Sequence, residues 1–226
     1  MAANGDEPRG FSHKLEGEIE GRGGRMSAFE FFFSFYGLVL GLSVTVIATG
    51  IARAFKHRKT VKVGWKTPVL AAFVALDIAT FWDAAWTNFS TAPYSYGLLI
   101  AGLVVATVYF VATSLVFPEP DDAVQDLDAH FWANKRAVML LLILANLMML
   151  VGAVCVSLPK SSGLQVAASY GLNLAIYLVL VIPAALTRRA WVFALTVGLH
   201  IALYLFLAGL SILNPARMAA AAAGAS

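Results

Sequence analysis

The chain has 226 residues, of which 60% are hydrophobic and 13% charged, and its mean hydropathy is +0.77. Soluble domains carry about 25% charged residues, so this composition excludes a water-soluble globular domain and predicts a protein embedded in the lipid bilayer. The net charge of +3 comes from residues between apolar runs. That distribution is typical of membrane loops and excludes nucleic acid as an expected partner.

The two ends of the chain differ from its middle. Residues 1–25 contain nine charged residues, many glycines and almost no apolar periodicity, which predicts a disordered tail. Ile19 to Arg22 spells a protease recognition sequence, which would make this segment a tag, and Met26 directly precedes the first apolar run, which would make it a misassigned start. Both alternatives stay open. Residues 26–217 are the predicted membrane domain, and residues 218–226 a disordered alanine-rich tail.

Six apolar runs of about twenty residues each predict an all-α bundle of six transmembrane helices. At 1.5 Å per residue, a run of this length crosses a hydrocarbon core of about 30 Å. The runs lack the strict alternation of barrel strands, which favours helices. Their predicted bounds are 30–54, 67–87, 95–117, 135–157, 164–186 and 190–213.

The basic residues predict the orientation. Ten of them fall in the loops after the first, third and fifth runs, whereas the opposite side, without the first tail, has only Lys160 and Arg217. Basic loops stay in the cytoplasm. We therefore expect a multi-pass protein of a bacterial inner membrane, with both termini outside.

The loop 118–134 is the most polar part of the membrane domain. Ala123, Val124, Leu127 and Phe131 recur at helical spacing, which predicts a short interfacial helix before the fourth span. The acidic residues of this loop, with His130, favour a solvated surface over a metal site. No metal and no cofactor are expected, because the runs hold a single histidine and the chain a single cysteine.

A weak internal repeat is visible. Residues 71–81 align with residues 167–177 at four identical positions, and Asp77 lies over Asn173. Apolar helices produce such matches easily, so chance similarity is one interpretation. A true duplication of three helices would make the two halves inverted with respect to each other, as in many transporters.

Polar residues at one depth form the candidate binding site. Asp77 lies ten or eleven residues into the second run, about 16 Å from its cytoplasmic end and near the midplane. A charged Asp there costs roughly 2.5–3.5 kcal/mol, so it must face protein or water, be neutralised or pair with a proton-binding group. The other residues of this predicted layer are Asn146, Asn173, His200 and Thr107. Hydrogen bonding between helices is the alternative role for them.

A ladder of small residues descends one face of the first run. Gly37, Gly41, Thr45 and Thr49 recur every four residues, a spacing that lets two helix backbones approach closely. We expect packing within the chain, with a homodimer through this helix as the alternative.

The chain contains none of the common catalytic motifs, so we do not expect an enzyme. Two functions remain. The first is a small transporter or channel whose midplane layer binds a proton, an ion or a small polar solute. The second is a non-transporting scaffold, assembly factor or accessory subunit. The two differ in whether Asp77 faces an aqueous cavity or a closed helix contact.

Overall fold

The computed structural model describes residues 28–90, 92, 95–119, 126–157 and 163–214. Within these residues the chain forms six helices, which confirms the all-helical prediction. The predicted tails, residues 1–25 and 218–226, lie outside the described residues. The helices are α2 (Ala28–Lys56), α3 (Lys66–Phe89), α4 (Tyr96–Ser114), α5 (Leu127–Ser157), α6 (Gly163–Leu186) and α7 (Ala190–Leu213).

Five of the helices, all except α6, are long and apolar enough to cross a membrane. The described part of α6 is apolar over Tyr170–Leu186, which is shorter than a full crossing. The chain is therefore an integral membrane protein that crosses the bilayer several times. A sixth crossing through α6 stays a prediction.

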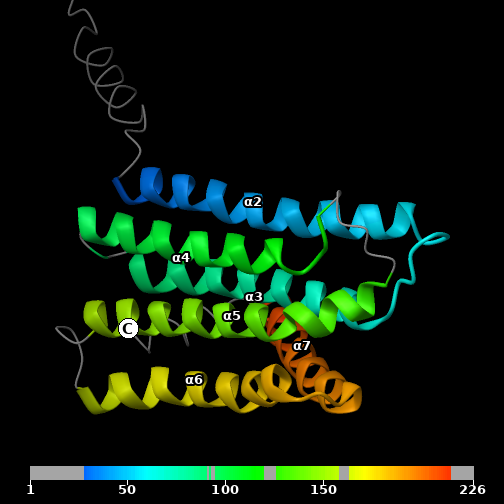
Figure 1. The fold of residues 1–226 in the computed structure, drawn as a ribbon. Helices are drawn as coiled ribbons and strands as arrows, with labels where there is room; N and C mark the ends of the chain where they lie inside the picture. The colour runs from blue at the N-terminus through cyan, green and yellow to red at the C-terminus, as the bar shows by residue number, and fades with distance from the viewer. Residues whose placement is uncertain (1–27, 91, 93–94, 120–125, 158–162, 215–226) are drawn as a thin grey trace, which may run out of the picture.

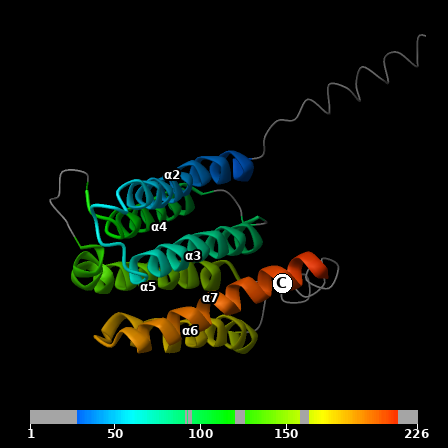
Figure 2. The same cartoon turned by 90° about the vertical axis from the view of Figure 1, so that its right-hand side faces the viewer.

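The helices form three layers of two (Figures 1 and 2). α2 packs along α4 in one outer layer, α3 lies beside α5 in the middle, and α6 packs on α7 in the other outer layer. α4 contacts α5 and α2 contacts α3, whereas α6 and α7 reach the middle layer through α5 and α3 respectively. α3 and α5 are thus covered on both sides, which places their mid-span polar residues in the centre of the protein.

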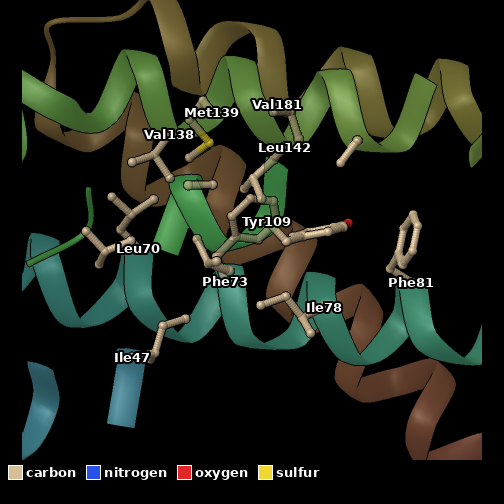
Figure 3. Close-up of a cluster of buried hydrophobic side chains, with 14 of the residues drawn as sticks. Ile47, Leu70, Phe73, Ile78, Phe81, Tyr109, Val138, Met139, Leu142 and Val181 are labelled. Atoms are coloured by element: carbon tan, nitrogen blue, oxygen red, sulfur yellow. The ribbon is translucent and has the colours of Figure 1, made fainter. Parts of the chain in front are cut away.

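Each outer helix buries one stripe and exposes the rest. In α2 the buried residues recur every three or four positions, at Tyr36, Leu40, Ser43 and Ile47. The large side chains between them, such as Leu38 and Leu42, are exposed on the outside of the bundle. Because the lipid is as apolar as the core, hydropathy alone does not distinguish the two faces. Figure 3 shows the buried side, where Tyr109 of α4 lies among side chains of α3 and α5.

The arrangement of helices does not confirm the internal repeat. α2 packs extensively on α4, but the equivalent pair in the second half, α5 and α7, is not among the main helix contacts. Asp77 is buried and its aligned partner Asn173 is exposed. The two halves therefore differ both in packing and in the environment of the aligned polar residues.

From Leu127 on, the predicted interfacial helix is part of α5, whereas its first residues, Ala123 and Val124, lie outside the described residues. α5 begins at Leu127 and continues without a break to Ser157, eight residues earlier than the predicted start of the fourth span. Contacts with the start of α3 hold this early turn. The Thr67 hydroxyl donates to the Leu127 carbonyl at 3.2 Å, and Lys66 forms an ion pair with Asp128. Leu127 and Phe131 are buried, so their helical spacing marks the first turns of α5 rather than a helix on the membrane surface.

The acidic residues near this turn do not gather around a metal position. Among the described residues no group of three or more His, Cys, Asp or Glu could hold a metal ion. Asp128 pairs with Lys66, and His130 contacts the Leu115 carbonyl at 3.2 Å. Asp121 and Asp122 lie outside the described residues.

The ladder of small residues contributes to packing at one position only. A Cβ at Gly37 would lie 2.0 Å from Cη2 of Trp82 in α3, so this glycine allows a close contact. A Cβ at Gly41 would meet nothing within 4 Å, and Thr45 and Thr49 are exposed. The expectation that the ladder packs within the chain is therefore wrong for Gly41, Thr45 and Thr49. These residues face outward because the buried stripe of α2 follows a different set of positions.

Candidate functional site

Asp77 of α3 is the centre of a buried hydrogen-bond network. Its side chain is 1% exposed. The Tyr109 hydroxyl of α4 donates to Oδ2 at 2.9 Å, and Nδ2 of Asn146 in α5 donates to the same oxygen at 3.2 Å. The Tyr204 hydroxyl of α7 donates to Oδ1 at 2.9 Å. One carboxylate thus links α3 to three other helices.

Tyr177 of α6 and His200 of α7 lie beside this network. Their rings meet edge to face with centroids 5.2 Å apart, and the His200 ring lies 4.5 Å from that of Tyr204. The Tyr177 hydroxyl lies near Asp77 but outside standard hydrogen-bond geometry. Among the described residues, the buried Tyr177 hydroxyl and His200 Nδ1 have no hydrogen-bond partner of standard geometry. Five helices therefore bring polar groups to one region.

Further contacts position two of the donors around Asp77, Asn146 and Tyr109. Nδ2 of Asn146 also donates to the Leu142 carbonyl one turn back in α5, at 3.0 Å, which fixes the amide toward α3. The Tyr109 ring is fully buried and meets Phe81 edge to face at 4.9 Å. Aromatic packing of this kind holds a ring in one orientation. The two contacts keep the donors directed at the carboxylate.

The described part of the network contains no basic partner that donates to the acid. The donors to Asp77 there are two phenols and an amide, all neutral, and no Lys or Arg donates to it. An ionised carboxylate accepts all three bonds, and a protonated one can donate to a tyrosine oxygen, since a phenol both donates and accepts. The site is therefore chemically able to hold or release one proton with the same set of neighbours.

The predicted midplane layer is only partly assembled. Asp77 and Asn146 are joined by a hydrogen bond, and His200 lies in the same cluster through ring contacts. Thr107 is exposed and donates to the Leu103 carbonyl of its own helix at 2.8 Å. Asn173 is exposed on α6. Equal depth placed these five residues at one level, but the rotation of each helix about its axis decides which of them face inward.

The three tyrosines were not among the candidate residues predicted from the sequence. Tyr109, Tyr177 and Tyr204 are included in the hydrophobic fraction of the composition, yet each brings a hydroxyl to the buried acid or its surroundings. A signal for one of them existed. Tyr204 follows His200 by four residues, which puts both on one face of α7. No comparable sequence signal relates Tyr109 to Asp77.

An apolar cavity of about 80 Å³ lies near the network without reaching the acid. Phe81, Val105 and Met148 belong to its lining, but Asp77 does not. In this conformation the carboxylate lies in a closed contact between helices. Comparison with protein families, curated proteins and solved structures yields no match.

Proposed function

We propose that the protein is a small proton- or cation-coupled transporter and that Asp77 is the group that binds the proton or cation. One observation supports this proposal most strongly. A fully buried acid at mid-span depth has only neutral hydrogen-bond donors and no basic partner among the described residues.

Burial of Asp77 without a positively charged partner among the described residues has an energetic cost. An isolated charge at the centre of a membrane helix costs roughly 2.5–3.5 kcal/mol on insertion scales. Three neutral donors offset part of this cost, but binding a proton or a cation removes the net charge altogether. Inside the membrane, such a site is more stable with the proton or cation bound. It releases that ion only where water reaches the carboxylate.

The enclosure of Asp77 sets a requirement for this function. Transport needs the site to open to each side in turn, so the closed contact would correspond to an occluded state. The bonds from Tyr204 in α7 and Tyr109 in α4 must then break in the open states. The Tyr177 hydroxyl and His200 Nδ1 have no hydrogen-bond partner among the described residues in the closed arrangement, so they are available as alternative partners.

The same enclosure favours a second candidate function, a non-transporting membrane scaffold or accessory subunit. In that role Asp77 would hold four helices together and would never meet water. Polar contacts between membrane helices are worth about 0.6 kcal/mol each on average, and three of them on one side chain form a local anchor.

Proton flux into proteoliposomes distinguishes the two functions. Wild type is compared with Asp77→Asn under an imposed pH gradient, across a panel of ions and small solutes. Asp83→Asn is the matched control, because Asp83 is an exposed acid on the same helix. The transporter proposal predicts flux that Asp77→Asn abolishes and Asp83→Asn preserves. Flux that survives Asp77→Asn would contradict the role of Asp77.

Stability measurements test the scaffold alternative in parallel. Asp77→Leu removes the acceptor for Tyr109, Tyr204 and Asn146, and unsatisfied buried donors cost about 1–3 kcal/mol each. Asp77→Asn keeps one acceptor oxygen, so it should be the milder change. A scaffold predicts that Asp77→Leu lowers the melting temperature in detergent strongly, that Asp77→Asn lowers it little, and that neither wild type nor variant carries flux.

A further inference from the structure

A second cavity lies at the end of the bundle that carries the basic loops, where the last two turns of α2 meet the segment after α4. Its volume is about 450 Å³. One wall is basic, with Arg53 and Lys56 from α2 and His57 directly after its end. The other wall is apolar and includes Phe117 and Leu127.

A glycine shapes the floor of this cavity. A Cβ at Gly50 would lie 2.2 Å from Cδ2 of Phe117, so the backbone of α2 and this aromatic ring approach more closely than any other residue at position 50 would permit. The contact holds the residues after α4 against α2 and leaves the space above it between the apolar and the basic wall.

The basic wall is available to a ligand. Arg53 and Lys56 are both exposed and, within the described part of the chain, neither pairs with an acidic side chain. Glu119 also lines the cavity and is the one acid among its described lining residues. Among these residues, two permanent positive charges therefore face one negative charge, and His57 adds a third positive charge when protonated. The balance favours an anion.

The position of the cavity in the protein indicates which kind of anion it is suited to bind. The cavity lies at the end of spans α2 and α4, where the hydrocarbon core meets the headgroup region. Trp65 and Trp132 lie at the same end, next to Lys66 and Lys135 respectively, as is typical of the membrane interface. An apolar wall beside a basic wall fits an amphipathic molecule, whose apolar part contacts the first wall and whose anionic group contacts the second.

We propose that this cavity binds the headgroup of an anionic phospholipid, with the phosphate on Arg53 and Lys56 and the glycerol with the first chain carbons against Phe117. Basic pockets between membrane helices bind anionic headgroups in this way. A soluble phosphate would meet the same two charges but would leave the apolar wall unused. This inference is independent of the function proposed for Asp77.

The test measures lipid binding by the full chain. Purified protein is delipidated in detergent, and its melting temperature is followed with added phosphatidylglycerol, phosphatidylcholine or inorganic phosphate. We expect phosphatidylglycerol alone to stabilise wild type. Arg53→Ala with Lys56→Ala should weaken the apparent affinity for phosphatidylglycerol roughly thirtyfold, since each of the two basic contacts near an anionic surface contributes about 1 kcal/mol.

A matched control separates the site from general surface charge. Arg188→Ala with Arg189→Ala removes the same charge at the same end of the bundle, outside the cavity. This pair should retain the wild-type affinity, and Arg53→Lys with Lys56→Arg should retain most of it. Equal loss in the control pair would overturn the proposal in favour of nonspecific attraction. An equal shift with inorganic phosphate would overturn the assignment of a lipid.

Discussion

Lys135 has a structural role that its position in the sequence does not indicate. It lies in a basic loop by sequence, but in the structure its side chain is 4% exposed. Its ammonium donates to the carbonyls of Ala184 at 2.7 Å and Ala185 at 3.2 Å, and also to that of Thr187. The last carbonyls of a helix have no partner within it, and a cation there also meets the negative end of the helix dipole. Lys135 therefore fixes the end of α6 to α5.

Replacing Lys135 should destabilise the protein. Lys135→Met removes the donor to three buried carbonyls, and a hydrogen bond to a charged group contributes about 1.5–3 kcal/mol. We expect a loss of about 2 kcal/mol in unfolding free energy, measured by denaturation in mixed micelles. Arg136→Met is the control, because Arg136 is exposed and adjacent. Equal effects of the two substitutions would show that the bonds to α6 contribute no stability.

In α2, the face of the helix on which a small residue lies decides whether that residue allows close packing. Gly37 touches Trp82, whereas Gly41, one turn further, has open space on its side. Gly41 lies outside the buried stripe formed by residues such as Leu40 and Ser43. The outward surface that it shares with Thr45 and Thr49 faces lipid, or a second copy of the chain if the protein forms a homodimer.

Gly37 and Gly41 should therefore respond differently to the same substitution. Gly37→Leu places a branched side chain against the Trp82 ring, and overpacking of this kind costs about 1–3 kcal/mol. Gly41→Leu should leave the melting temperature of the isolated chain unchanged. If α2 mediates a homodimer, Gly41→Leu should lower self-association in crosslinking or single-molecule photobleaching. A melting temperature reduced equally by both substitutions would contradict the packing described for α2.

The alternation of the helices brings three loops to one end of the molecule. The chain passes from α2 to α3, from α4 to α5 and from α6 to α7 at the same end, and the ten basic residues of the sequence analysis lie at or near these connections (Figure 1). Contacts across this end include the Lys66–Asp128 ion pair and the bonds of Lys135 to α6. The basic residues thus share one end, which the positive-inside rule assigns to the cytoplasm.

Reporter fusions measure this orientation. A reporter fused after Lys59 or after Arg189 should be active in the cytoplasm, and one fused after Asn88 or at the C-terminus should be active outside. The expected result follows from the charge difference between the two ends. Fluorescent protein and alkaline phosphatase report the two sides in opposite ways and so control for expression. An external location of Lys59 would invert the topology.

Within the described residues, the number of helices, the mid-span depth of Asp77 and the helix bounds follow from the sequence, because hydropathy and helix rise are local properties. The bounds agree to within a few residues except at the start of α5, which lies eight residues earlier than predicted. The neighbours of Asp77 do not follow from the sequence. Thr107 and Tyr109 lie two residues apart, yet the first faces outward and the second donates to the acid. Successive residues turn by about 100°, and in lipid both faces of a helix are apolar. Only the packing of the three layers decides which face turns inward, and with it the partners of Asp77 and Lys135.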